Sequence, residues 1–292
     1  MDNRAESREF LSTRRAKISP AQAGLTSAGR NRRVAGLRRE EVAILAGVSV
    51  DYYTRLERNG LAGVSEGVLD GVAHALQLSE AERDHLFDLA RAANRSAARR
   101  SASSPQRVRP GIQRMLDVIN APAVVRNGRL DFLATNALGF ALYAELFEEP
   151  IRPVNNARFV FLNARARDYY PDWETVASDA VSALRVEAGR DPYDRGLTDL
   201  VGELSTRSDE FRRRWATHDV AFHRAGSKRI RHSDVGELEL FYEALEIPGE
   251  PGLRLTTYTA EPGSPSQDAL VLLASWAATV RPQALPEPRI TR

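Results

Sequence analysis

The stretch EEVAILAGVSVDYYTRLERNG, from Glu40 to Gly60, holds two short apolar stripes separated by a glycine-containing turn. Gly47 is expected to supply the left-handed backbone that lets a short turn join two helices at a steep angle. Ser49 is expected to cap the second helix by accepting a backbone N–H, and Gly60 to end it. The stretch therefore predicts two short helices packed against each other, the second over residues 50–59.

The two sides of this second helix differ in chemistry. At 3.6 residues per turn, Tyr53 and Leu56 share one side, which we expect to pack inward against the first helix. The opposite side carries four residues with no expected partner in the protein: Val50, Asp51, Thr54 and Arg55. This is the geometry of a helix-turn-helix, whose second helix enters the DNA major groove with its N-terminal residues at the base edges.

The exposed side chains suit the recognition of bases. Arg55 can pair with guanine, Asp51 can accept from a cytosine amine, and Val50 can contact a thymine methyl group. A second set around the helix is expected to contact phosphates and to position the protein without reading sequence: Arg30, Arg32, Arg33, Arg38, Arg39, Tyr52 and Arg58. An ordinary α-hairpin would explain buried Tyr53 and Leu56, but not the cations gathered around an exposed polar face.

Composition supports a DNA-binding module within a larger chain. The chain has 292 residues, 42% of them hydrophobic, which is enough for two domains. Residues 1–60 hold 12 Lys and Arg against 7 Asp and Glu, a local excess that favours a polyanionic partner. We expect a helical DNA-binding domain over 1–93, a basic linker over 94–110, a second domain over 111–280 and a tail over 281–292.

Several classes of protein are disfavoured. The sequence has no cysteine, so disulfides and a thiolate nucleophile are excluded. It has no run of eighteen apolar residues and no signal-like segment near Met1, so we expect a cytoplasmic protein with no membrane partner. The spacing of His218, His223 and His232 does not match a metal motif, and no catalytic constellation is evident. We expect no enzyme activity, cofactor or metal.

The sequence pattern changes after the predicted linker, where strand-like runs appear. Residues 122–136 read as a hairpin around Asn127-Gly128, and GELELFYEAL and GLRLTTYTA read as two strands near the C-terminus. Three helices are expected between these pairs, and a further strand is suggested near residues 229–233. The pattern predicts an α+β domain in which one antiparallel sheet has helices to one side.

The stretch RRVAGLRREEVAILAGVSVDYYTRLERNG resembles the Xre-type helix-turn-helix of bacterial regulators, especially the branch with an MmyB-like C-terminal domain. The resemblance implies a bacterial transcription factor, usually dimeric, with a PAS-like C-terminal domain proposed to bind a small apolar molecule such as a fatty acid. The fold class is then multidomain, an all-α helix-turn-helix domain followed by an α+β PAS-like domain. A homodimer would read a palindromic double-stranded operator with half-sites about 34 Å apart, which is one helical turn, or a multiple of that distance.

The residues able to contact such a ligand are mostly aromatic or aliphatic. They are Phe132, Phe140, Phe159, Phe161, Trp215, His218, Leu238, Leu240, Tyr242 and Leu255, of which His218 would bond a polar head group. Alternation along the strand places Leu238, Leu240 and Tyr242 on one face, with Leu255 on the neighbouring strand. The alternative is a C-terminal domain that only dimerises or binds a partner protein.

Overall fold

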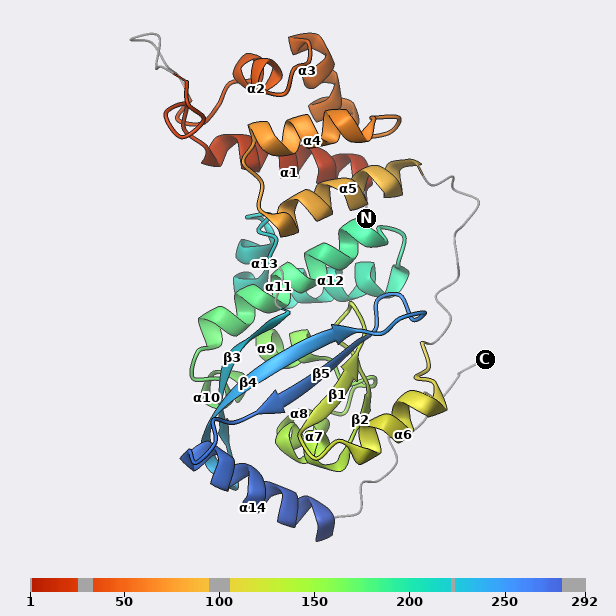
Figure 1. The fold of residues 1–292 in the computed structure, drawn as a ribbon, viewed down its shortest axis with the longest axis vertical. Helices are drawn as coiled ribbons and strands as arrows, with labels where there is room; N and C mark the ends of the chain where they lie inside the picture. The colour runs from red at the N-terminus through yellow and green to blue at the C-terminus, as the bar shows by residue number, and fades with distance from the viewer. Residues whose placement is uncertain (1, 26–33, 95–105, 222–223, 280–292) are drawn as a thin grey trace. The chain divides into compact units, whose positions relative to one another are not determined.

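The computed structural model describes residues 2–25, 34–94, 106–221 and 224–279 (Figure 1). The predicted tail over 281–292, most of the predicted linker and His223 lie outside this part of the chain. The described chain divides into two compact units. Unit 1 comprises residues 1–102, 185–198 and 214–221, and unit 2 comprises residues 103–184, 199–213 and 222–292. The units are thus interleaved along the chain, whereas the sequence suggested contiguous domains.

Unit 1 contains a bundle of short helices, as predicted. They are α1 (Asn3–Lys17), α2 (Arg39–Leu45), α3 (Val50–Asn59), α4 (Glu66–Ala75) and α5 (Glu80–Asn94). Ser79 begins α5 with a reciprocal cap, in which its Oγ accepts from the Glu82 amide at 3.3 Å and its own amide donates to Glu82 at 2.8 Å. The buried side chains include Phe10, Leu37, Val42, Tyr53, Leu69 and Leu86.

The remaining elements surround one antiparallel sheet of five strands in the order β2-β1-β5-β4-β3 (Figure 1). The strands are β1 (Ala123–Arg126), β2 (Phe132–Thr135), β3 (Ala225–His232), β4 (Gly236–Glu246) and β5 (Arg254–Thr259). The helices are α6 (Pro110–Val118), α7 (Ala137–Leu142), α8 (Ala144–Phe147), α9 (Asn156–Leu162), α10 (Ala166–Tyr169), α11 (Trp173–Arg190), α12 (Arg195–Arg207), α13 (Asp209–Trp215) and α14 (Pro265–Thr279). The additional strand suggested near residues 229–233 is confirmed as part of β3.

The predicted hairpin is present, but its connection is longer than the two-residue turn that Asn127-Gly128 favours. β1 ends at Arg126 and β2 begins at Phe132. The side-chain oxygen of Asn127 accepts from the amides of Arg129 and Asp131, each at 3.0 Å. Asn127 therefore organises a wider loop, in which Leu130 takes the left-handed conformation with φ of 67°.

The two faces of the sheet are covered by different helices. Val124, Leu238, Leu240 and Tyr258 face the main core, which includes residues from α7 to α11 and from α14. On the other face, Val125 and Leu255 pack with residues of α6. Because successive side chains of a strand point to opposite faces, the expectation of helices on one side was wrong, and Leu255 is separated from the residues grouped with it.

Candidate nucleic-acid interface and interior polar cluster

The second helix of the quoted stretch forms as predicted. The Oγ of Ser49 accepts from the amide of Tyr52 at 3.1 Å, which satisfies one of the free N–H groups at the start of α3. Gly47 has φ of 68° and Gly60 has φ of 90°. Tyr53 and Leu56 are buried in unit 1, which confirms the inward side of the helix.

The other side of α3 is open. Val50 is 44% exposed although it is apolar, and Asp51 and Arg55 are exposed beside it. Thr54 is half-buried. The Arg55 guanidinium lies 5.2 Å from the centre of the Tyr52 ring, and among the described residues it makes no ion pair. This surface offers an apolar contact, an acceptor and a cation within two turns of helix.

A buried acid orients α3, and the sequence analysis missed it. Glu57 is 1% exposed, and its carboxylate accepts from Arg15 of α1 at 3.1 Å and from Arg39 of α2 at 2.8 Å. Burial by itself raises the pKa of Glu57, but the bonds from the two guanidinium groups outweigh it and lower the pKa below its usual value. Helix periodicity could have predicted the burial of Glu57, since this residue follows Leu56 and lies on the inward side of α3.

The predicted phosphate-contacting residues have different environments. Arg30, Arg32 and Arg33 lie outside the described residues. Arg38 is partly exposed and pairs with Glu40 at 3.5 Å, and Arg58 is exposed near the end of α3. Arg39 is engaged by Glu57, so it braces the two helices in addition to any contact with DNA.

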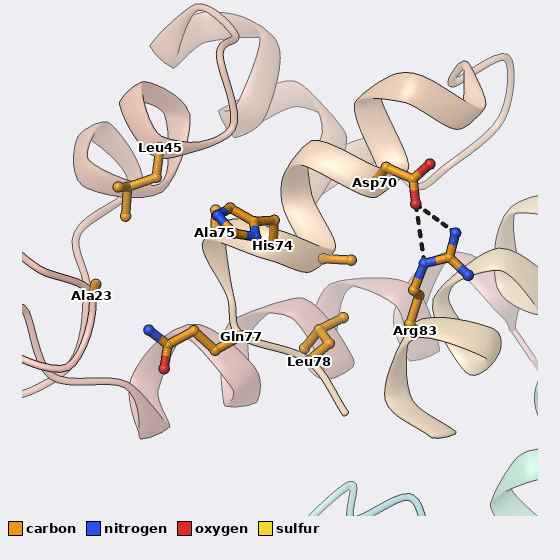
Figure 2. Close-up of a pocket in the computed structure, with 9 residues that line it drawn as sticks. Ala23, Leu45, Asp70, His74, Ala75, Gln77, Leu78 and Arg83 are labelled. Carbon is orange, nitrogen blue, oxygen red and sulfur yellow. Dashed lines mark hydrogen bonds and ion pairs between the residues drawn. The ribbon is translucent and has the colours of Figure 1, made fainter. Parts of the chain in front are cut away.

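A pocket of about 440 Å³ lies near these helices, between Leu45 at the end of α2 and the residues of α4 and its following turn (Figure 2). Its two charged side chains pair with each other, Arg83 Nη2 with Asp70 Oδ1 at 2.6 Å (Figure 2). The side-chain amide of Gln77 donates to the carbonyl of Gln22 at 2.7 Å. Because these groups are already satisfied, we interpret the pocket as a hollow left by helix packing.

In unit 2, the sheet face that looks into the main core carries an unexpected polar cluster. Arg126 of β1 donates to Thr256 of β5 at 3.3 Å, and on the same face of β5 the hydroxyl of Tyr258 lies 2.5 Å from that of Tyr143. Tyr258 pairs in register with Tyr242 of β4. Hydroxyl groups and a guanidinium therefore lie together inside an otherwise apolar core.

Lys228 of β3 completes the cluster. Its Nζ lies 5.6 Å from the ring centre of Tyr170 and 5.7 Å from that of Tyr242. Among the described residues, the side chain of Lys228 makes no hydrogen bond or ion pair. Burial lowers the pKa of Lys228. Burial alone would raise the pKa of Tyr258, but the charges of Lys228 and Arg126 lower it below its usual value.

The predicted ligand-contacting residues fall into separate places. Phe132, Phe159, Leu238 and Leu240 are buried in the main core, and Phe140, Phe161 and Tyr242 pack against it half-buried. Trp215 and His218 belong to unit 1, apart from these residues. Leu255 lies on the opposite sheet face.

The polar members of the cluster were not predicted, because only the apolar residues of the alternating strands were expected to face the core. The alternation of LRLTTYT puts Thr256 and Tyr258 on the sheet face that Leu255 does not share. The alternation of AGSKRIRH puts Lys228 on the same face as Ile230. The alternation that predicts the buried apolar residues therefore also places Lys228, Thr256 and Tyr258 on the inner face of the sheet.

A second hollow in unit 2 has a volume of about 860 Å³. Residues of α6, β2, α7 and α14 line it, among them Leu133, Thr135, Phe140 and Ala277. Its size lies within the range usual for small-molecule sites. Phe140 belongs to both this cleft and the margin of the main core, so the two features adjoin.

A helix-turn-helix whose second helix has an open side, joined to an α+β domain, is the architecture of a transcription regulator with a ligand-binding domain. The comparison with known families agrees: residues 28–86 match a helix-turn-helix domain. Residues 108–273, more than half of the chain, match the MmyB-like transcription regulator ligand binding domain, and the chain belongs to that family. A comparison with curated proteins finds no match. None of the helices in the described part of the chain is long and apolar enough to cross a membrane.

Proposed function

We propose that the protein binds a palindromic operator as a homodimer and reads bases with the open side of α3. The exposure of Val50, Asp51 and Arg55 at the start of that helix supports this assignment, because the first turns of a recognition helix lie closest to the base edges. Glu57 supports it indirectly, since its ion pairs fix the inward side of the same helix.

We further propose that unit 2 binds an amphipathic molecule with an anionic head group, such as a fatty acid. The observation that carries this proposal is the pair of cations, Arg126 and Lys228, which share one inner sheet face and have no carboxylate bonded to them among the described residues. Both cations are half-buried, and a partly desolvated charge with no carboxylate bonded to it gains from pairing with an anion that enters this cluster. The apolar core around it would hold the hydrocarbon tail.

The test compares acids with alcohols of the same chain length. Octanoate, dodecanoate and hexadecanoate would be titrated into the delipidated full-length protein beside the corresponding alcohols. A charged hydrogen bond contributes about 1.5–3 kcal/mol, so the acids should bind at least about tenfold more tightly. Lys228→Met should reduce this preference, with Arg126 left as the remaining cation. Arg229→Met is the matched control, because Arg229 is the next residue along β3, and pairs with Asp172 on the surface.

Equal affinity for acids and alcohols, or an unchanged preference in Lys228→Met, would contradict the head-group assignment. Mass spectrometry of an extract from the purified protein gives an independent answer, since a co-purified carboxylic acid supports the assignment. Selection of bound DNA from a random pool tests the operator, and a selected sequence without two-fold symmetry would contradict the palindrome.

A C-terminal domain that serves only for association is the second candidate. One observation favours it: Val271, Leu272 and Trp276 of α14 are all more than two-fifths exposed. A second copy of the chain suits this apolar surface, because a palindrome requires two copies. Leu272→Glu should shift sedimentation from dimer to monomer, and an unchanged dimer would exclude this surface.

A further inference from the structure

The cleft of about 860 Å³ in unit 2 has no role in the proposed function. Residues of α6, β2, α7 and α14 line it, and all of them belong to unit 2. The anion proposed above pairs with Arg126 and Lys228, and neither of these residues lines the cleft. The groups that do line it therefore define a ligand of their own.

The walls of the cleft are mostly apolar. Leu133 of β2 and Leu138 and Phe140 of α7 line it, and all three are half-buried. α14 contributes only alanines, which are three and four residues apart and share one face of the helix: Ala274, Ala277 and Ala278. Alanine side chains fill little space, so a ligand with an apolar body has room to cover the half-buried side chains and gains from doing so.

Two polar residues of the cleft already use their donors within the protein. The Asn136 side chain accepts from two backbone amides and donates to two backbone carbonyls, at distances between 2.7 and 3.1 Å. The Thr135 hydroxyl donates to a backbone carbonyl, either that of Ala123 at 3.2 Å or that of Asn136 at 2.9 Å. Neither side chain therefore has a donor left for a ligand.

The acceptors that remain available come from α6. The Nε2 of Gln113 donates to one carboxylate oxygen of Asp117 at 2.9 Å and lies 3.5 Å from the carbonyl of Thr135. Among the described residues, nothing donates to the side-chain carbonyl of Gln113 or to the second carboxylate oxygen of Asp117. Both groups can accept from a ligand, and they lie one turn apart on the same helix.

The charge of the cleft is negative. Asp117 is the one ionisable side chain among the described residues that line it, and it is exposed. Within the described ranges it forms no ion pair. Asn120 adds an exposed amide that can donate or accept. The complementary ligand is apolar over most of its surface and carries a positively charged donor at one end.

We propose that this cleft is a second small-molecule site of unit 2, which binds a primary amine with an apolar chain or ring. The amine is protonated at neutral pH, and its ammonium group has three N–H donors and no acceptor. It donates to the carboxylate of Asp117 and to the side-chain carbonyl of Gln113, while the apolar part covers the walls. The ligand is opposite in charge to the anion of the polar cluster, so this inference goes beyond the proposed function and does not depend on it.

The test compares three ligands of one chain length on the delipidated full-length protein. Decylamine, decyltrimethylammonium and decanol would be titrated below the concentrations at which they aggregate. Decylamine should bind at least about threefold more tightly than decanol, which is the gain expected of an exposed ion pair. Decyltrimethylammonium keeps the charge without an N–H donor, so its affinity should lie between the two. Equal affinities for decylamine and decanol would overturn the inference.

Asp117→Asn tests the charged partner. It should abolish the preference for decylamine over decanol and leave the affinity for decanol unchanged. The matched control is Asp168→Asn, because Asp168 is another exposed aspartate on a helix of unit 2 and does not line the cleft. A preference that survives Asp117→Asn would overturn the assignment of Asp117.

Ala274→Trp tests the location, because the larger side chain fills the cleft from an exposed position that should tolerate it. Decylamine and decanol should both bind about fivefold or more weakly, since less apolar surface is left for them to cover. Ser275→Trp is the control, because Ser275 is the next exposed residue of α14 and lies outside the cleft. Unchanged binding in Ala274→Trp would place the ligand elsewhere.

The acids of the proposed function give the remaining outcomes. Lys228→Met should leave decylamine binding unchanged, and Asp117→Asn should leave the preference for acids over alcohols unchanged. Loss of both preferences in either variant would show one shared site and overturn the second one. Decanoate that binds as tightly as decylamine and is equally weakened by Ala274→Trp would show that the cleft does not select amines. Failure of all acids to bind would remove the anion site alone.

Discussion

The carboxylate of Glu57 accepts two hydrogen bonds from the guanidinium of Arg15, each at 3.1 Å. This bidentate pair ties the inward side of α3 to α1, and Arg39 adds a bond from α2 to the same carboxylate. The direction in which the open side of α3 points is therefore set by a buried ionic network as well as by Tyr53 and Leu56. Glu57 and Arg15 lie on the inward side of α3, and we expect them to affect DNA binding without contacting the DNA.

Glu57→Gln should lower the free energy of unfolding of unit 1 by about 3 kcal/mol, because it leaves the largely buried guanidinium of Arg15 without a counter-charge. Urea unfolding monitored by helical circular dichroism measures this change. Glu40→Gln is the control, since Glu40 pairs with Arg38 on the surface and such pairs contribute about 1 kcal/mol or less. Similar losses in the two variants would show that the network is not important for stability.

Arg55→Ala should reduce the preference for operator over random DNA by about tenfold or more, because a base contact of this kind discriminates by about 1–3 kcal/mol. Competition binding with labelled operator and unlabelled random DNA measures this ratio. If the variant weakens binding to both DNAs equally, Arg55 contacts the backbone rather than a base.

Arg38→Ala should weaken binding to operator and random DNA alike and reduce the salt dependence of the affinity by about one counterion. Titrations at several salt concentrations give the slope of the logarithm of affinity against the logarithm of salt. An unchanged slope would remove Arg38 from the set of phosphate contacts.

Gly47→Ala should destabilise unit 1 by about 1 kcal/mol, because φ of 68° is costly for a residue with a Cβ while no atom lies within 4 Å of the added group. Gly67→Ala should instead stabilise unit 1. Gly67 lies in α4 with open space around it, and alanine favours the helix by up to about 1 kcal/mol. Thermal unfolding of both variants checks the contrast. Two shifts of the same sign would contradict the backbone argument.

His85→Leu should flatten the pH dependence of stability on the acidic side. Burial lowers the pKa of His85 from its usual 6.5 to about 3, and the surrounding charges that modify it are Glu6, Arg185, Arg14 and His218. The unfolded chain therefore takes up a proton below about pH 6.5 that the folded chain refuses until about pH 3, so folding weakens as the pH falls through this window. The slope approaches about 1.4 kcal/mol per pH unit.

Glu6 acts in the same direction at lower pH. Its pKa of about 2 in the folded chain adds stability above its usual value of 4.5, and this stability is lost as the pH falls below that value. The window between about pH 6.5 and pH 4.5 therefore isolates His85. Unfolding can be followed with Trp215 of unit 1 after Trp173→Phe and Trp276→Phe, and an unchanged slope in His85→Leu would show that His85 is not the group responsible.

Local sequence signals predicted the first domain closely. The cap at Ser49, the turn at Gly47 and the inward pair Tyr53 and Leu56 all follow from the period of a helix and from backbone sterics, which act over a few residues. The strands of the second domain were also found, because alternation and turn residues are equally local. The sequence did not predict that Trp215 and His218 belong to unit 1 or that Leu255 faces away from the main core, because these placements depend on contacts between distant parts of the chain.

The sequence by itself determined that this chain has a helix-turn-helix whose second helix has one open side, and an antiparallel α+β domain. Only the tertiary structure decided that Arg126 and Lys228 share an inner sheet face, and that Arg185 pairs with Glu6 across 179 positions of the chain. The physical reason is that periodicity reports which side of an element is buried. It does not report which other element covers that side, and buried charges are placed by the partner that covers them.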